Sequence, residues 1–421
     1  MDKFIIQGGN PLNGEVLISG AKNAALPILC SSILADSPCT YTNIPALRDI
    51  SSITKVLATL GMGIERPDKG CVVVNPTEVI SCEAPYELVK SMRASILVLG
   101  PLLAKYKKAK VSLPGGCAIG VRPIDMHLKA LSKMGAYITI SHGYVMAFAE
   151  GLKGARILFD TPTVGGTENI MMAATLAEGT TVIEGAAKEP EVVDLAQALI
   201  QMGAHIEGAG RSTITIEGVP SLSGLDYEVI PDRIEVGTFL IAGAITKGEL
   251  LIKGARMDHV VAIVEKLCDM GVEITQRKDG SIYVNGKGDL RPAQVETVPY
   301  PGFPTDMQAQ IMTLACIAKG VSRITENIFE NRFMHVPELM RMGGHLEEKG
   351  NTVMVQGVKQ LQGASVMATD LRASASLVLA ALNAQGYTEI RRIYHLDRGY
   401  EELDKKLNQL GAQVRRERGG L

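Results

Sequence analysis

The sequence predicts an α/β protein of two inverted, inside-out α/β barrel domains, built from six repeats of about 70 residues, three per domain. Two observations predict this fold: a Leu-Gly or Met-Gly pair that recurs along the chain, and two kinds of helical pattern that alternate between the pairs. Successive glycines of these pairs are 68 to 74 residues apart, and the pairs are Leu60-Gly61, Met134-Gly135, Met202-Gly203, Met270-Gly271, Met342-Gly343 and Leu410-Gly411.

The length of the chain also favours two domains. At 421 residues it exceeds one ordinary core, and two domains of about 200 residues are the natural expectation. Six repeats divide evenly into three per domain. The boundary between repeats three and four is predicted within residues 220–230, and the first strand of the chain could pair with either half.

The first kind of helical pattern is apolar nearly all round and rich in Ala, Leu, Ile and Met. A helix without a polar face must be buried on all sides, so these helices are predicted to lie inside each domain. They are Ala24–Ala35, Ala94–Ala104, Ile170–Ala177, Val236–Ile245, Met307–Ala318 and Ser374–Ala384.

The second kind alternates charged and apolar residues at helical spacing, as on a helix packed on one face. The glycine that ends each pattern is typical of a left-handed helix C-cap. These helices are Ile53–Leu60, Asp125–Met134, Val192–Met202, Val260–Met270, Val336–Met342 and Glu401–Leu410. Between the helices lie β-rich stretches such as 180–184 and 212–217, and sheets of such strands outside three apolar helices would satisfy both patterns.

Composition excludes several classes of protein. The net charge of −2 argues against a nucleic-acid-binding surface, and no apolar run approaches the ~18 residues that span a bilayer. We see no signal peptide, and seven cysteines without a CxxC pair favour reduced thiols in the cytoplasm. Four of them are predicted to be small core residues: Cys30, Cys39, Cys268 and Cys316. The scattered histidines lack metal-ligand spacing, so no metal site is expected.

The loop from Leu113 to Asp125 departs most from the repeat pattern. Three glycines and two prolines make it sharply turned, and it carries Cys117 and Arg122. A thiol beside a cation in a glycine loop is a candidate reactive group. The alternative is an ordinary surface turn with an incidental cysteine.

Charges gather at the start of the apolar helices. They are Lys22 with Asn23, Arg93, Asp232 with Arg233, Asp306, and Asp370 with Arg372. Helix N-termini attract anions, and added lysine or arginine builds a phosphate or carboxylate site. Each aspartate has the alternative role of an N-cap, and Arg332 and Arg398 have the alternative role of solvated ion-pair partners. If the two domains face each other by these ends, the charges converge on one cleft.

Six stretches together resemble the UDP-N-acetylglucosamine 1-carboxyvinyltransferase family, the UDP-N-acetylglucosamine enolpyruvyl transferases. The resemblance runs the full length of the chain, and the Cys117 loop is its most specific part. The matching stretches are 19–27 (SGAKNAALP), 92–95 (MRAS), 114–123 (PGGCAIGVRP), 304–306 (PTD), 330–332 (ENR) and 370–374 (DLRAS).

The resemblance implies transfer of the enolpyruvyl group of phosphoenolpyruvate to the 3-hydroxyl of UDP-N-acetylglucosamine, the first committed step of peptidoglycan synthesis. These two small molecules are the partners that it implies, with no cofactor and no metal. It also implies two inverted barrels: residues 22–229, carrying the loop 113–125, and residues 1–21 with 230–421.

The resemblance implies roles for individual residues. Cys117 is the general acid, a target of the epoxide fosfomycin; Asp306 is the base; and Lys22 and Arg398 stabilise developing charge. Phosphoenolpyruvate would be bound by Lys22, Asn23, Arg48, Arg122, Arg332, Arg372 and Arg398. UDP-N-acetylglucosamine would be bound by Asn23, Arg93, Arg122, Pro123, Ile124, Asp125, Thr163, Val164, Gly165, Asp306 and Ile328.

One departure from the family concerns the diphosphate. Many members have Lys-x-Ser-Val-Gly, whereas this chain has Thr161-Pro162-Thr163-Val164-Gly165. The missing lysine leaves the diphosphate contact open. Two alternative functions also remain open: a 5-enolpyruvylshikimate-3-phosphate synthase-like transferase, which the Cys117 loop disfavours, and a repeat protein that binds anions without turnover.

Overall fold

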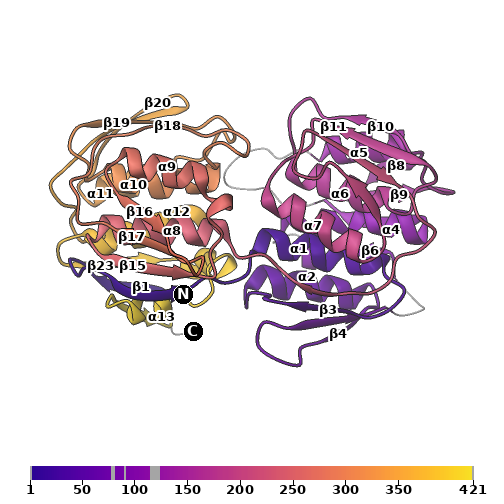
Figure 1. Ribbon diagram of the computed structural model, residues 1–421, viewed down its shortest axis with the longest axis horizontal. Coiled ribbons are helices and arrows are strands. Elements are labelled where there is room, and N and C mark those ends of the chain that lie inside the picture. The colour runs from indigo at the N-terminus through magenta and orange to yellow at the C-terminus, as the bar shows by residue number, and fades with distance from the viewer. Residues whose placement is uncertain (1, 77–80, 90–91, 114–123, 420–421) are drawn as a thin grey trace. The chain divides into compact units, whose positions relative to one another are not determined.

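The computed structural model describes residues 2–76, 81–89, 92–113 and 124–419. The chain forms two compact units; in Figure 1 one is coloured from indigo to magenta, and the other from red to yellow with the start of the chain in indigo. Unit A contains the described residues between 20 and 230, and unit B contains residues 2–19 and 231–419. Both units have the same layers, with helices inside and sheets outside, which confirms the predicted fold class.

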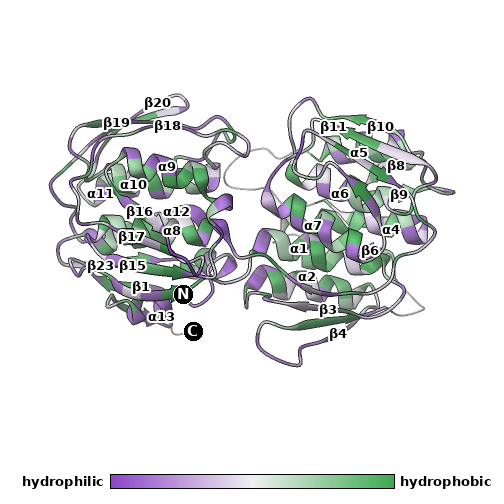
Figure 2. Cartoon of the chain, in the orientation of Figure 1, coloured by the Kyte–Doolittle hydropathy of each residue, from purple (hydrophilic) through white to green (hydrophobic). Residues whose placement is uncertain are grey.

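Three helices fill the centre of each unit and pack against one another. Nearly all of their residues are buried, and Figure 2 shows hydrophobic residues concentrated on them. All six apolar runs form such helices, as predicted. In unit A they are α1 (Lys22–Ser31), α4 (Leu99–Tyr106) and α6 (Val164–Ala174), and in unit B α8 (Arg233–Ile245), α10 (Gln308–Ala315) and α12 (Leu371–Asn383). Short 3-10 turns extend three of them: η1 (Ser32–Leu34), η2 (Arg93–Val98) and η4 (Thr305–Met307).

The six amphipathic helices are also present, and each buries one face against its unit. They are α2 (Arg48–Thr59), α5 (Asp125–Lys133), α7 (Pro190–Gln201), α9 (Val261–Asp269), α11 (Val336–Arg341) and α13 (Leu403–Gln409). Shorter pieces are α3 (Tyr86–Val89), η3 (Met257–His259) and η5 (Ile393–Arg398).

The prediction that Cys268 is a core residue was wrong, because its thiol is exposed on α9, whereas Cys30, Cys39 and Cys316 are buried. The buried face of α9 contains Leu267, and one residue further the helix has turned about 100°.

The described strands form six four-stranded sheets with one shared pattern. An edge strand runs parallel to its neighbour, and the remaining pairs are antiparallel. Unit A contains the sheets β14-β3-β5-β4, β6-β7-β9-β8 and β10-β11-β13-β12, with the strands β3 (Cys39–Thr42), β4 (Gly63–Glu65), β5 (Val72–Asn75), β6 (Glu83–Ala84), β7 (Lys108–Ser112), β8 (Tyr137–Ser141), β9 (Tyr144–Phe148), β10 (Arg156–Leu158), β11 (Thr180–Glu184), β12 (His205–Glu207), β13 (Thr213–Glu217) and β14 (Asp226–Glu228).

Unit B repeats this pattern but takes two strands from the start of the chain. Its sheets are β16-β17-β15-β2, β18-β19-β21-β20 and β22-β23-β1-β24, with the strands β1 (Lys3–Gln7), β2 (Asn13–Leu17), β15 (Glu249–Lys253), β16 (Glu273–Gln276), β17 (Ile282–Asn285), β18 (Gln294–Glu296), β19 (Val321–Thr325), β20 (His345–Lys349), β21 (Thr352–Gln356), β22 (Ser365–Met367), β23 (Tyr387–Arg391) and β24 (Gln413–Glu417).

The sequence left open which half the first strand joins. In the structure β1 lies antiparallel between β23 and β24, with Lys3 opposite both Arg391 and Glu417. It therefore occupies the place that the second strand of a hairpin occupies in the other five sheets, such as β21 beside β20. Phe4 and Ile6 bury its inner face in the core of unit B.

The six glycines of the repeat have φ angles between 87° and 108°, as the C-cap prediction requires. In every repeat the residue after this glycine donates its N–H to the carbonyl of a leucine five positions earlier, which is a Schellman bond. The donor and acceptor residues are Met62 and Leu57, Ala136 and Leu131, Ala204 and Leu199, Val272 and Leu267, Gly344 and Leu339, and Ala412 and Leu407.

Gly203 offers a test of this cap, because its φ is 108° and a Cβ there would meet no heavy atom within 4 Å. Gly203→Ala should therefore lower the free energy of unfolding through backbone strain alone, by about 1–2 kcal/mol. Gly151 is the matched control, since it has the same open space without a left-handed φ. Urea unfolding at neutral pH measures both, and equal stabilities of the two variants would contradict the C-cap argument.

A cluster of charged residues as the candidate active site

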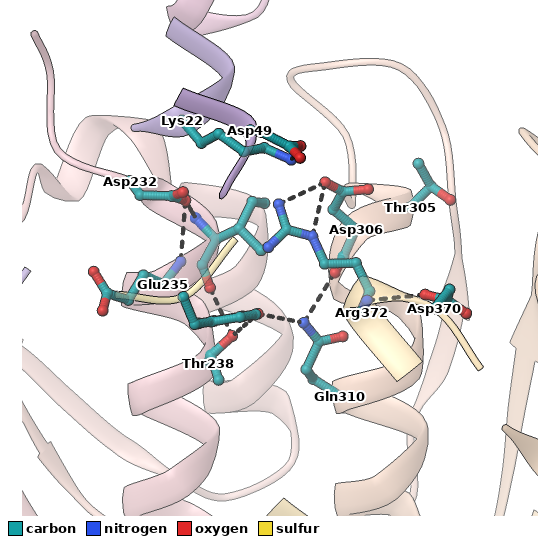
Figure 3. A network of polar contacts seen from close by, with 12 residues as sticks. Lys22, Asp49, Asp232, Glu235, Thr238, Thr305, Asp306, Gln310, Asp370 and Arg372 are labelled. Atoms are coloured by element: carbon teal, nitrogen blue, oxygen red, sulfur yellow. Dashed lines mark hydrogen bonds and ion pairs between the residues drawn. The ribbon is translucent and has the colours of Figure 1, made fainter. Parts of the chain in front are cut away.

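The carboxylate of Asp306 lies between two arginines in unit B. Asp306 belongs to η4, directly before α10. Its Oδ1 accepts a hydrogen bond from Nη2 of Arg332 at 2.7 Å. Its Oδ2 accepts from Nε and Nη2 of Arg372 at 3.0 and 2.9 Å, as Figure 3 shows. Three residues that are far apart in the sequence therefore meet at one carboxylate.

Burial makes these ion pairs strong. The side chains of Arg332 and Arg372 are each 4% exposed, and that of Asp306 is 27% exposed. Burial alone would raise the pKa of Asp306, but Arg372 and Arg332 outweigh it and hold that pKa well below its usual range. Asp306 is therefore ionised at neutral pH. Two cations around one anion leave an excess positive charge, which suits an anionic ligand.

The predicted N-cap alternative applies to two of the three aspartates. The side chain of Asp232 accepts the N–H groups of Ile234 and Glu235, and that of Asp370 caps α12 in the same way. Asp306 makes no such cap, because its oxygens face the arginines. The alternative of a solvated ion pair for Arg332 was wrong, since its guanidinium is buried.

Four polar side chains that the sequence analysis missed support this cluster. Gln310 donates from Nε2 to the backbone carbonyl of Asp306 at 3.0 Å and to the hydroxyl of Tyr400 at 3.3 Å. Thr238 lies 2.9 Å from that hydroxyl, and Thr305 accepts from Nη1 of Arg332 at 2.8 Å. Polar residues at the start of an otherwise apolar helix were the available signal, since burial there requires partners.

Lys22 and Asp49 form a second ion pair, in unit A. Lys22 is the first residue of α1 and is 8% exposed. Its Nζ lies 3.2 Å from Oδ2 of Asp49, in the first turn of α2. Asp49 was missed from the sequence, while the neighbouring Arg48 is exposed, as is Asn23.

Five of the residues predicted to hold the nucleotide sugar lie at the starts of α5 and α6 in unit A. Thr163 caps α6, accepting the N–H of Gly166 at 3.2 Å, and Val164 is 37% exposed. A Cβ on Gly165 would lie 3.4 Å from Cε1 of His127, so only a small residue fits without adjustment. Asp125 begins α5 and pairs with Lys129 at 3.3 Å, and the preceding Ile124 is half-buried.

Several predicted residues lie elsewhere. Ile328 is 37% exposed in the segment after β19, and the half-buried Arg398 ends η5. Arg93 begins η2. Cys117, Arg122 and Pro123, and the side chain of Arg93, lie outside the described residues, so their assignments stay predictions.

Two features are absent from the described part of the chain. Its helices are too short or too polar to cross a membrane. Its histidine, cysteine and acidic side chains form no group of three or more that could hold a metal ion.

Known proteins resemble this chain over its full length. A family profile, EPSP synthase (3-phosphoshikimate 1-carboxyvinyltransferase), matches residues 6–407. A UDP-N-acetylglucosamine 1-carboxyvinyltransferase of Nitratidesulfovibrio vulgaris strain DP4 is 58% identical over 99% of this chain and 100% of its own length. The chain belongs to the UDP-N-acetylglucosamine 1-carboxyvinyltransferase family.

Further relatives agree with this assignment. The protein of the same name from Lawsonia intracellularis is also 58% identical, over 99% of both chains. The crystal structure of the enolpyruvyl transferase NikO from Streptomyces tendae matches with a TM-score of 0.89 and 27% identity, over 99% of this chain and 98% of that one. An EPSP synthase from Acinetobacter baumannii has a TM-score of 0.80 at 19% identity over 99% of this chain and 100% of its own, and therefore shows the fold alone.

His335, beside this cluster, predicts a pH dependence of stability. It is 1% exposed, and burial lowers its pKa to about 4; Asp370 opposes this shift, and the charge of Arg332 adds to it. Between pH ~6.5 and 4 the unfolded chain therefore binds a proton that the native state does not, so stability falls as the pH falls, by roughly 3 kcal/mol for this group.

His335→Gln should flatten this dependence, as measured by urea midpoints at pH 7.0 and 5.0. His345→Gln, at an exposed position on β20, is the control and should keep the wild-type difference. The same difference in all three proteins would contradict the role of His335.

Proposed function

We propose that this protein transfers the enolpyruvyl group of phosphoenolpyruvate to the 3-hydroxyl of UDP-N-acetylglucosamine, with release of phosphate. The observation that carries the proposal is Asp306 bound by two buried arginines, in a chain 58% identical to enzymes named for this reaction. The reaction belongs to peptidoglycan synthesis, and we place it in the cytoplasm.

The chemistry is addition followed by elimination. Protonation of C3 of phosphoenolpyruvate makes C2 electrophilic, and we assign this proton to the thiol of Cys117, the group that fosfomycin would alkylate. The sugar hydroxyl attacks C2 and loses its proton to Asp306. The tetrahedral intermediate then expels phosphate, whose charge Lys22 and Arg398 stabilise.

The geometry of Asp306 adds a condition to this mechanism. A carboxylate bound on both oxygens by arginines is ionised but weakly basic. Phosphoenolpyruvate carries a phosphate and a carboxylate, which compete for Arg332 and Arg372. Binding of this substrate loosens the arginines from Asp306 and raises its basicity, so the base becomes active only when the enolpyruvyl donor is present.

The remaining assignments concern binding. We assign Asn23, Arg48 and Arg122 to phosphoenolpyruvate together with the two arginines. We assign the nucleotide sugar to the residues at the starts of α5 and α6, and to Asn23, Arg93, Arg122, Asp306 and Ile328. The N-terminus of α6 offers N–H groups to the diphosphate in place of the missing family lysine.

Phosphate release from phosphoenolpyruvate tests the function. We expect release with UDP-N-acetylglucosamine and none with shikimate 3-phosphate, measured in parallel with one phosphate-detecting assay. Release with shikimate 3-phosphate alone would keep the fold and reverse the assignment of the acceptor. Release with neither, from protein that unfolds cooperatively, would favour an anion-binding protein without turnover.

The role of Asp306 is tested by Asp306→Asn, which keeps the shape and removes the basic oxygen. We expect kcat to fall by about 10²–10⁴-fold, with the KM for UDP-N-acetylglucosamine within a few-fold of wild type. Asp289→Asn is the control, because this carboxylate is 74% exposed and pairs only with Lys319 among the described ion pairs. A wild-type kcat for Asp306→Asn would remove Asp306 from the mechanism.

A further inference from the structure

Glu326 is a buried carboxylate that the mechanism above does not use. It directly follows β19 and is 3% exposed. Among the described residues no lysine or arginine forms an ion pair with it, so hydrogen-bond donors must satisfy its buried oxygens.

Four donors surround Glu326. Its Oε1 accepts from the hydroxyl of Thr297 at 2.9 Å and from the backbone N–H groups of Ile328 and Phe329 at 2.8 and 3.1 Å. Its Oε2 accepts from the hydroxyl of Thr305 at 2.8 Å. Both oxygens are therefore fixed, one on the segment after β19 and one on η4.

The bond to Thr305 sets the direction of a short relay. An arginine only donates, so the Thr305 hydroxyl accepts a hydrogen bond from Arg332 and donates its own hydrogen to Oε2 of Glu326. Nη1 of Arg332 donates a hydrogen bond to the Thr305 hydroxyl at 2.8 Å, and Nη2 of the same guanidinium donates to Oδ1 of Asp306 at 2.7 Å. Glu326 thus orients the group that holds one end of the Arg332 guanidinium.

A second route leads from Glu326 to the same arginine. The ring of Phe329 lies 5.2 Å from Cζ of Arg332, within the range of a cation–π contact. The backbone N–H of Phe329 is bound by Glu326, so the carboxylate also places this ring. The same segment carries the exposed Ile328.

We infer that Glu326 is a positioning residue for the transfer reaction: through Thr305 and Phe329 it holds Arg332 in line with Asp306 and with the incoming phosphoenolpyruvate. The inference rests on the proposed function, because it takes Arg332 as a substrate-binding group. The alternative is that Glu326 only ties the end of β19 to its neighbours, in which case its removal would lower stability without a specific change in kinetics.

A double-mutant cycle separates these two roles. Glu326→Gln replaces the carboxylate oxygen that accepts from Thr305 by an amide NH₂ group or a neutral amide oxygen. Thr305→Val removes the hydroxyl while keeping the shape of the side chain. Each should lower kcat/KM for phosphoenolpyruvate by about tenfold or more, the effect of losing a hydrogen bond to a charged group. If Glu326 acts through Thr305, the double variant should lose little more than the worse single variant.

Thr352→Val is the matched control. Its hydroxyl lies 3.0 Å from that of Thr325, the residue before Glu326, but has no bond to Glu326 or Arg332. It should keep kcat/KM within twofold. Strictly additive losses for Glu326→Gln and Thr305→Val, or losses no larger than that of Thr352→Val, would overturn the inference.

A pH profile gives a readout that a purely structural role would not move. In both variants Arg332 is held less firmly beside Asp306, so it lowers the pKa of Asp306 less than in the wild type. The acid limb of the kcat/KM profile should therefore shift to higher pH. The other charged and titratable groups around this network are Arg372, Asp232, Asp370, His335 and Tyr400, and the variants leave all of them in place.

The outcomes distinguish failure of this inference from failure of the proposed function. Absence of phosphate release by the wild-type protein would overturn the function itself. Wild-type turnover with unchanged profiles in both variants would overturn only the role of Glu326. Thermal unfolding is measured for each protein, and if Glu326→Gln does not fold, Thr305→Val against Thr352→Val decides the question.

Discussion

The structure depends on one constraint: six helices have no polar face and must be buried on every side. In each unit three such helices bury part of their surface against one another, and the sheets cover the rest. The helices therefore lie inside and the strands outside. The constraint also decides where charge can lie. The helix interiors admit almost none, so the charged residues gather at the first turns, where N–H groups lack helical partners.

Charges at those first turns are themselves partly buried, and burial demands accurate pairing. An unpaired buried ion costs several kcal/mol, so each charge is met by named partners. Asp306 has two arginines, Lys22 has Asp49, and Glu326 has four donors without a cation. The same polar groups that make burial tolerable hold the arginines in one orientation. Stability and the preparation of an anion site therefore have a common physical origin.

Unit B shows that a sheet of the repeat can be completed by a strand from a distant part of the chain. β1 completes the sheet of β23 and β24 in the last repeat, and β2 adds an edge strand to β15 in the first repeat of unit B, so the start of the chain supplies one strand to each of two sheets. The inner residues Phe4 and Ile6 are buried as in any central strand. A sheet needs a strand of the right pattern in the right register, and the connection along the chain is of secondary importance.

The sequence by itself determined what is local. The positions of the helices follow from the apolar periodicity, and the left-handed conformation of the six glycines follows from the residues beside them. Both depend on contacts within one or two helical turns. The motifs also marked Asp306, Arg332 and Arg372. Only the tertiary structure decided which aspartates cap helices, that Arg332 is buried, and that Asp49 and Glu326 belong to the charged clusters. These outcomes depend on partners about 20 to 70 residues away, such as Arg372 and Asp306, 66 positions apart, and a local pattern carries no information on such distances.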